Sequence, residues 1–248
     1  MKQLSIIIAT YNAADTLNSC LASIIKQKND EVEVLIIDGK STDATLDIVH
    51  SYGDKIDVFL SEPDQGIYDA WNKGIARASG HWIMFIGADD ILVEGSLLPY
   101  MQYVKQISSQ KVDIITAKAR FIDLNGRLIK IVGEPFCWKK GKKNMNISHG
   151  STLHSRRLFE EIGGYSLDYR ICADYELLMR KGEKLRCAFY DRVILLFKIG
   201  GASFSIKCQY ETFRIRKKYR TVPLAVNLYL SLKRMAGIAL KSLIYTTK

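Results

Sequence analysis

The chain has 248 residues, enough for one large domain or for one domain with an appendage. Hydrophobic residues make up 48% and charged residues 25%, as is ordinary for a soluble globular protein. No apolar run reaches about 18 residues, which argues against a membrane-spanning helix. The five cysteines form no CxxC pair and are odd in number, so free thiols in a reducing cytoplasm are expected.

The net charge of +10 is concentrated at the C-terminal end of the chain. From Lys207 onward there are ten Lys or Arg residues and one acid, whereas the preceding 206 residues carry 26 basic and 25 acidic groups. The larger part of the chain is therefore nearly neutral, and the tail is strongly basic. This asymmetry predicts that the tail docks on an anionic surface.

The first half of the chain alternates short apolar segments with helical patterns. Strands are predicted at 4–9, 32–37, 58–60, 82–86 and 112–116, and helices at 15–28, 43–51, 66–78 and 94–106. Strands that alternate with helices of this length form βαβ units. We therefore expect an α/β fold whose central sheet is mostly parallel and has helices on both faces.

The second half departs from this pattern. Residues 117–132 alternate in polarity and contain Asn125-Gly126, a strong hairpin signal, so an antiparallel excursion is expected. A loop over 133–148 follows, and its basic cluster is Lys139, Lys140, Lys142 and Lys143. Helices are predicted over 155–162 and 172–182, and a strand pair is predicted over 186–197.

The tail from Lys207 is predicted to be helical, with a break near Pro223. In its second half one helical face would carry Leu228, Leu232, Met235, Ala239 and Leu243, and the other would carry Arg234, Lys241 and Lys248. This pattern is typical of an amphipathic helix that lies on a membrane, and the excess of cations favours anionic lipid. The alternative is a helix that packs its apolar face on the domain and leaves its cations in solvent.

Two adjacent carboxylates follow the apolar segment 82–86. Asp89 and Asp90 come at the carboxyl end of this predicted strand, where ligands bind in open α/β sheets. Carboxylate oxygens there suit Mg²⁺ or Mn²⁺ that also binds phosphate. The alternative is a helix N-cap, because Asp is a favoured residue at that position.

Polar residues also follow the first two predicted strands. Tyr11 could stack on a base and Thr10 could bond it, although no GxGxxG or P-loop pattern is present and a plain turn is the alternative. Asp38 ends the second strand, where an acid can accept hydrogen bonds from a base or a ribose. Further on, Gly66 opens a helix whose N–H groups can approach an anion. Asp69, Asn72 and Lys73 lie about one turn apart and can share a face, and Asn inside a helix is poorly explained by propensity.

Six motifs, in this order and spacing, resemble those of family-two glycosyltransferases with a GT-A fold. They are SIIIATYN at 5–12, DGKSTD at 38–43, GIYDAWNKG at 66–74, GADD at 87–90, ICADYELL at 171–178 and GGAS at 200–203. The resemblance covers roughly residues 3–205. Within the family, the chain is similar to bacterial enzymes of cell-surface polysaccharide biosynthesis. It implies a GT-A catalytic domain over 1–206, with a nucleotide-binding half (1–116) and an acceptor-binding half (117–206), before the basic amphipathic tail (207–248).

The resemblance implies a role for each matching position. Asp174 would be the general base. Asp90, with Asp89, would ligate a divalent metal ion, Mn²⁺ or Mg²⁺, bound to the diphosphate of a nucleotide-sugar, with UDP favoured over other nucleotides. The residues expected to bind the donor are Thr10, Tyr11, Asp38, Gly66, Asn72, Lys73 and Asp89. Two departures from the family pattern are Gly39, where many members have a second Asp, and Gly87, where many have the first carboxylate of a DxDD run.

These parts predict a direct displacement. Asp174 would take the proton of an acceptor hydroxyl as it attacks the anomeric carbon, so the anomeric configuration inverts. The alternative for Asp174 is a first-turn acid of its helix. We expect the acceptor to be a glycan or a saccharide linked to polyprenyl diphosphate, with His149 on the acceptor side. A single His is more often a structural hydrogen bonder, which is the alternative for His149.

We therefore expect a cytoplasmic glycosyltransferase, peripheral on the inner face of the cell membrane through its tail, with no nucleic-acid partner. Three other interpretations stay open. A sugar-nucleotidyltransferase would need a Gly-rich, Arg-containing loop after the first strand, which is absent. A membrane- or nucleic-acid-binding protein driven by the tail would leave the acids of the core unexplained. A catalytically inactive relative would bind nucleotide-sugar without transfer.

Overall fold

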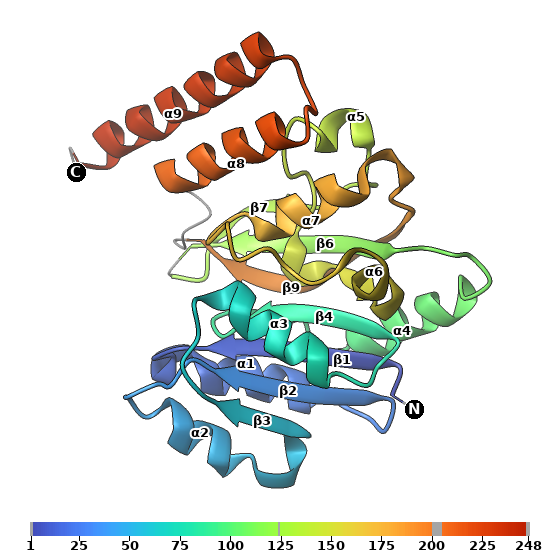
Figure 1. Cartoon of the computed structure of the whole chain (residues 1–248). Helices are drawn as coiled ribbons and strands as arrows, with labels where there is room; N and C mark the ends of the chain where they lie inside the picture. The colour runs from blue at the N-terminus through green and yellow to red at the C-terminus, as the bar shows by residue number, and fades with distance from the viewer. Residues whose placement is uncertain (1, 124, 200–204, 247–248) are drawn as a thin grey trace.

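The computed structural model describes residues 2–123, 125–199 and 205–246, with side chains described up to residue 237 (Figure 1). The strands are β1 (Leu4–Thr10), β2 (Val32–Asp38), β3 (Val58–Ser61), β4 (Trp82–Gly87), β5 (Ile91–Leu92), β6 (Ile114–Ile122), β7 (Leu128–Val132), β8 (Leu153–Ser155) and β9 (Cys187–Lys198). The α-helices are α1 (Ala14–Ile25), α2 (Thr45–Ser51), α3 (Ile67–Arg77), α4 (Leu97–Gln106), α5 (Trp138–Gly141), α6 (Arg156–Ile162), α7 (Ala173–Lys181), α8 (Ile206–Lys218) and α9 (Leu224–Thr246). Short 3₁₀ turns lie at Gly53–Lys55, His149–Ser151 and Gly182–Lys184.

The described strands form one nine-stranded sheet in the order β3-β2-β1-β4-β8-β6-β9-β5, with β7 paired to β6. The four strands β3, β2, β1 and β4 are parallel, as the alternation of strands and helices predicts. Their register aligns Thr10 with Asp38 and Ala9 with Gly87, so the polar residues that follow these strands meet at one edge of the sheet. This edge carries the predicted donor site.

Helices cover both faces of the sheet, and the strand alternation assigns each residue to a face. Ile6 and Ile8 of β1 point to the core that α1 and α4 cover, and Ile7 points to the opposite core under α3, α6 and α7 (Figure 1). The parallel strands are buried on both sides, which explains why they read as continuous apolar segments. The predicted α/β fold, a parallel set of strands with helices on both faces followed by an antiparallel excursion, is confirmed.

The second half of the sheet differs from the prediction in two places. The hairpin at Asn125-Gly126 is present as β6 and β7, with Gly126 in the left-handed region at φ 77°. The strand pair predicted over 186–197 is wrong, because the single strand β9 covers that segment and pairs with β6. Register shifts around Lys118 bend this pairing, and such bulges interrupt the alternation that marks a strand. The three-residue strand β8 is too short to show any periodicity.

The tail forms the helix pair α8 and α9, broken at Pro223 as predicted, and lies at the far end of the molecule from α2 (Figure 1). Among the described residues, no helix has the length and apolarity needed to cross a membrane. For the side chains described, up to residue 237, the alternative in which α9 packs its apolar face on the domain is wrong; Ala239, Lys241, Leu243 and Lys248 lie outside the described side chains. Arg234 turns toward the domain and is partly buried, whereas Leu228 and Leu232 are exposed.

Candidate active site

Asp38 is held by its own neighbours at the carboxyl end of β2. Its carboxylate is fully buried and accepts hydrogen bonds from Thr10 Oγ1 (2.9 Å), from Ser41 Oγ and N–H (2.5 and 2.9 Å) and from Ser61 Oγ (2.8 Å). Burial alone would raise the pKa of Asp38, but these hydrogen bonds outweigh it and lower that pKa. The structure therefore gives Thr10 and Asp38 a shared role in fixing the ends of β1 and β2. Their part in donor binding stays a prediction.

Tyr11 is largely exposed directly beyond Thr10, with its ring beside Gly39. A Cβ at Gly39 would lie 3.4 Å from the Tyr11 ring and only 2.5 Å from Asp64 Oδ2. The carboxylate of Asp64 thus takes the space that a side chain at position 39 would need, close to where many family members have their second Asp. The sequence prediction missed Asp64, although the turn around Pro63 and Gly66 marks a loop at this edge.

The segment that precedes α3 is fixed by ion pairs. Lys73 Nζ contacts Glu62 (3.0 Å), Asp69 (3.5 Å) and the Pro63 carbonyl (2.7 Å). Asn72 uses both ends of its amide on the backbone of Tyr165, at 2.7 and 2.8 Å, which explains a polar residue inside this helix. Gly66 adopts φ 115°, a conformation that glycine tolerates best. These contacts are structural, and the donor-binding role of the three residues stays a prediction.

Asp89 and Asp90 follow β4 directly, and both carboxylates lie close to the Cα of Gly87. Asp89 is exposed, whereas Asp90 is buried, and its Oδ2 accepts the Gly87 N–H at 3.2 Å. Burial first, and then the charge of Asp89, raise the pKa of Asp90 to about 8, while the Gly87 and Lys198 backbones and the Lys198 charge oppose this shift. A Cβ at Gly87 would lie 2.9 Å from Asp89 Oδ1 and 3.1 Å from Asp90 Oδ2. The glycine therefore leaves room for the two carboxylates to converge.

The residues present fit a divalent metal ion. Asp90 Oδ1 is buried and has no hydrogen-bond partner among the described residues, a costly state that a cation would relieve. Two hard carboxylate oxygen donors suit Mg²⁺ or Mn²⁺, which commonly complete their coordination with substrate phosphates and water. The described residues contain no cluster of three or more His, Cys, Asp or Glu side chains placed to bind metal. Phosphate oxygens of the donor would therefore have to supply part of the coordination.

Asp174 lies in the first turn of α7, and one of its carboxylate oxygens is fixed by hydrogen bonds. Its Oδ1 accepts the Tyr175 N–H at 2.8 Å and lies 3.1 Å from the Tyr68 hydroxyl, which also contacts the Ile171 carbonyl at 2.7 Å. No described residue bonds Oδ2. Burial raises the pKa of Asp174 to about 6, and the hydrogen bonds from Tyr175 and Tyr68 limit that rise. This carboxylate is poised to accept a proton near neutral pH.

A cavity of about 330 Å³ contains Asp174, His149 and two cations, Lys130 and Arg234. His149 stacks on Trp71, with ring centroids 4.8 Å apart, and its Nε2 lies 2.9 Å from the Tyr165 hydroxyl. Burial, with a smaller effect from His154, lowers the pKa of His149 well below its ordinary value, so the ring is neutral. The structure thus brings His149 and Asp174 into one cavity. The sequence prediction placed Arg234 on the solvent side of its helix and missed its position here.

Gly150 connects the two halves of the site. It lines the cavity that holds Asp174, and a Cβ at this position would lie 3.4 Å from Asp90 Oδ2. Asp90 itself does not line the cavity, but its carboxylate lies directly behind the Gly150 part of the cavity wall. The sixth sequence motif, GGAS at 200–203, lies outside the described residues.

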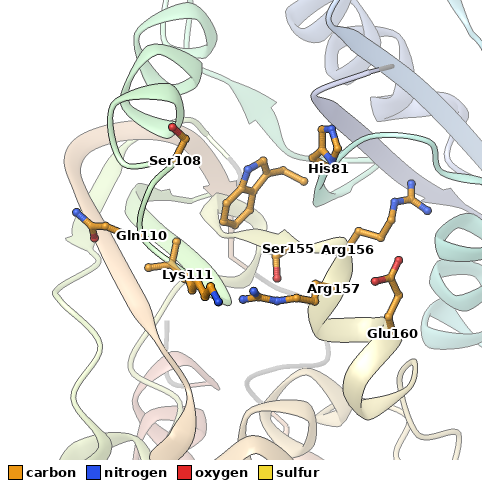
Figure 2. Close-up of a pocket in the computed structure, with 10 residues that line it drawn as sticks. His81, Ser108, Gln110, Lys111, Ser155, Arg156, Arg157 and Glu160 are labelled. Atoms are coloured by element: carbon orange, nitrogen blue, oxygen red, sulfur yellow. The ribbon is translucent and has the colours of Figure 1, made fainter.

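A second pocket, of about 320 Å³, lies at the amino end of β4, where Arg156, Arg157 and Glu160 are among its lining residues (Figure 2). Its arginines are already engaged. Arg156 donates to the carbonyls of Ala78 and Gly80, and Arg157 pairs with Asp113 at 3.3 Å. Glu160 is the acid among the residues that line this pocket, whereas Asp89 and Asp90 follow the opposite end of β4.

Comparisons with known proteins identify relatives of the chain. The model of the family "Glycosyl transferase family 2" matches residues 5–163. A "PGL/p-HBAD biosynthesis glycosyltransferase" of Mycobacterium bovis is 34% identical over 189 residues, which cover 71% of this chain and 68% of the relative.

Solved structures show the same fold at low identity. S. aureus TarS superposes with a TM-score of 0.69 at 19% identity, over 94% of this chain but only 43% of TarS. The mannosyltransferase PcManGT from Pyrobaculum calidifontis, in complex with GDP-Man and Mn²⁺, gives a TM-score of 0.67 at 16% identity, over 98% of this chain and 75% of that one. The family match, which spans more than half of the sequence, and the GT-A fold lead to one assignment. The chain belongs to glycosyltransferase family 2.

Proposed function

We propose that this glycosyltransferase moves a sugar, with inversion, from a UDP-sugar to a hydroxyl of a glycan or lipid-linked saccharide in surface polysaccharide biosynthesis. The observation that supports the proposal is that Gly150 lines the cavity of Asp174, and that a Cβ at Gly150 would lie 3.4 Å from Asp90 Oδ2. Two related folds support a nucleotide-sugar donor, since TarS residues 1–349 were solved with UDP-GlcNAc and PcManGT with GDP-Man. The name of the M. bovis relative assigns it to PGL/p-HBAD biosynthesis.

Donor binding and acceptor binding are assigned to different halves of the sheet. Residues 1–116 form the nucleotide-binding half, in which Tyr11 stacks on the base and Asp64 adds a carboxylate beside Gly39. Asp90 and Asp89 would hold a divalent ion, whose charge would stabilise the departing diphosphate as a Lewis acid. Residues 117–206, closed by the tail 207–248, form the acceptor half around the cavity of Asp174.

Proton removal is the task of Asp174. The acceptor hydroxyl donates to Asp174 Oδ2, transfers its proton there and attacks the anomeric carbon as the bond to the diphosphate oxygen breaks. Tyr68 positions the carboxylate through Oδ1, so the oxygen that accepts the proton stays directed into the cavity. A base on one face of the sugar and a leaving group on the other produce inversion.

The acceptor cavity favours a negatively charged acceptor. Lys130 and Arg234 both line it, and no ion pair of either side chain is present among the described residues. A saccharide linked to polyprenyl diphosphate would present phosphate oxygens to such cations. Neutral His149 lies within the same cavity and can exchange a hydrogen bond with a sugar hydroxyl.

A donor panel tests the proposal. The purified chain is heated with UDP-, GDP- and dTDP-sugars in the presence of Mn²⁺, and at least one UDP-sugar is expected to raise its melting temperature. A ligand at 100 times its Kd adds about 2.7 kcal/mol to the free energy of unfolding. Stabilisation by GDP- or dTDP-sugars alone would move the donor assignment to that nucleotide. Absence of any nucleotide-sugar effect would contradict the proposal.

The pH dependence of transfer is expected to follow Asp174. Because a base must be deprotonated, kcat/KM should rise with pH and level off above an apparent pKa of about 6. The hydrogen bond from Tyr68 lowers the pKa of Asp174, so Tyr68→Phe should move this limb to higher pH. Initial rates from pH 5 to pH 8 measure both effects, with Tyr210→Phe, an exposed tyrosine outside the cavity, as the control. An unchanged limb in Tyr68→Phe would contradict the positioning role of Tyr68.

A further inference from the structure

Helix α9 presents its polar residues to the protein and its apolar residues to solvent. Asn227 and Ser231 are buried against α8, whereas Leu224, Leu228, Leu232 and Met235 are between 39% and 65% exposed. These three leucines and one methionine share one face by their spacing of three and four residues. A helix on the surface of a globular domain normally has the opposite orientation.

The inward face is fixed by a buried arginine, so this orientation is built into the fold. Arg216 of α8 is fully buried and donates from Nε to Asn227 Oδ1 (2.6 Å), from Nη2 to Ser231 Oγ (2.8 Å) and from Nη1 to the Lys143 carbonyl (2.7 Å). Asn227 Nδ2 in turn donates to the Phe213 carbonyl. Rotating α9 to bury its leucines would remove Asn227 and Ser231 from the buried Arg216 guanidinium and leave it only the Lys143 carbonyl, which is strongly unfavourable.

The exposed charges of the helix pair α8 and α9 have one sign. In the described side chains of residues 205–237, every exposed charged group is a cation, namely Lys207, Arg214, Lys217, Lys218, Arg220 and Lys233. The one acid of this segment, Glu211, is buried and accepts the backbone N–H groups of Arg170, Ile171 and Cys172. Lys233 lies 5.9 Å from the ring of the exposed Tyr229, at the border of the apolar face.

We infer that the outward face of α9 docks on an anionic lipid bilayer, with its leucines in the headgroup region and the surrounding cations on lipid phosphates. An apolar stripe bordered by Lys and Tyr is the composition of helices that lie in a membrane interface. Each Lys or Arg near an anionic leaflet strengthens binding. Two copies of this chain would bring cations against cations at such a face, which disfavours self-association as its use.

Docking would also serve the acceptor site. Arg234 extends from the inward side of the same helix into the cavity that holds Asp174. The helix that contacts lipid thus contributes a wall of the acceptor cavity, so a lipid-linked acceptor would arrive at the membrane surface beside the base. This consequence rests on the proposed function, whereas docking itself does not require transfer.

Vesicle flotation tests the inference. The full chain is mixed with vesicles of phosphatidylcholine alone or of equal parts phosphatidylcholine and phosphatidylglycerol, without donor or acceptor. Flotation with the anionic vesicles only, and its weakening by added salt, are expected. The triple variant Leu228→Gln, Leu232→Gln, Met235→Gln should partition at least about tenfold more weakly. Leu98→Gln on α4, where Leu98 is 58% exposed, is the matched control for Leu232→Gln and should bind like the wild type.

Three outcomes would overturn the inference. The wild type could remain in the unbound fraction when it is mixed with anionic vesicles. Alternatively, the triple variant could float to the same extent as the wild type. Light scattering could also show a wild-type dimer that the triple variant loses, which would assign the face to a second copy of this chain. Because the stabilisation by UDP-sugars is measured separately on the same variants, failure of docking is distinguishable from failure of the proposed transferase function, and an unchanged response to UDP-sugars shows that each variant is folded.

Discussion

Replacing Asp174 by Asn is expected to lower kcat about 100- to 10,000-fold while donor affinity stays near the wild-type value. The amide keeps an oxygen that can accept the Tyr175 N–H, so the start of α7 should keep its geometry. It cannot take a proton from an acceptor hydroxyl at neutral pH. Measured rates of UDP release with acceptor present report the loss.

The control for this variant is Asp168→Asn, the same chemical change at an exposed acid outside the cavity. It should keep the wild-type rate. If Asp174→Asn kept more than about a tenth of the wild-type kcat, or lost donor affinity to the same extent as rate, the assignment of Asp174 as the general base would be wrong.

Stability separates loss of chemistry from loss of fold in Asp174→Asn. The pKa of Asp174 in the folded chain, about 6, is above its ordinary value of 3.8, so the folded state binds the proton more tightly than the unfolded state does. The free energy of unfolding therefore falls as pH rises from about 4 to about 6, and the penalty persists at pH 7. Asn carries no such penalty. The variant should melt at or above the wild-type temperature at pH 7, and this advantage should shrink toward pH 4.

Replacing Asp90 by Asn is expected to lower kcat/KM about 100- to 1000-fold and to weaken the response of donor binding to Mn²⁺. Asp90 Oδ1 has no partner among the described residues, and a neutral amide would give a cation less charge to bind. The amide oxygen can still accept the Gly87 N–H, so the loop after β4 should hold its shape. Melting curves with a UDP-sugar, with Mn²⁺ or with a chelator, measure the effect.

The donor-induced rise in melting temperature of Asp90→Asn is compared with that of the wild type in chelator. Both should show a small donor-induced rise in melting temperature, and only the wild type should gain a larger rise when Mn²⁺ is added. A wild-type protein that binds donor equally well in chelator would contradict the metal-binding role of Asp90 and Asp89. Asp168→Asn, which leaves the cleft untouched, should respond to Mn²⁺ as the wild type does.

The parallel half of the fold was predictable because each of its strands carries its own signal. β1, β2 and β4 are short apolar segments that end in Thr10, Asp38 and Gly87, and parallel pairing brings those ends to one edge. Local sequence therefore located both the sheet and the edge that holds the acids. The half of the sheet with mixed pairing was harder to predict, because β8 has only three residues and the pairing of β9 with β6 contains register shifts.

Side chains that support the site were not predictable, since their partners are distant in sequence. Tyr68 reaches Asp174 across 106 positions, and nothing local to either residue indicates the contact. The polar residues of α9 posed a different problem. Its amphipathic pattern defines two faces but does not say which one meets the domain, and that choice depends on the buried guanidinium of Arg216.

Calorimetric titration of a UDP-sugar into Asp174→Asn and into Asp90→Asn, both with Mn²⁺, tests most directly whether one cleft holds a donor side and a proton-accepting side. The account predicts that Asp174→Asn binds donor as tightly as the wild type does, although its transfer is lost, and that Asp90→Asn binds it much more weakly. Weak binding by Asp174→Asn together with wild-type binding by Asp90→Asn would contradict the account.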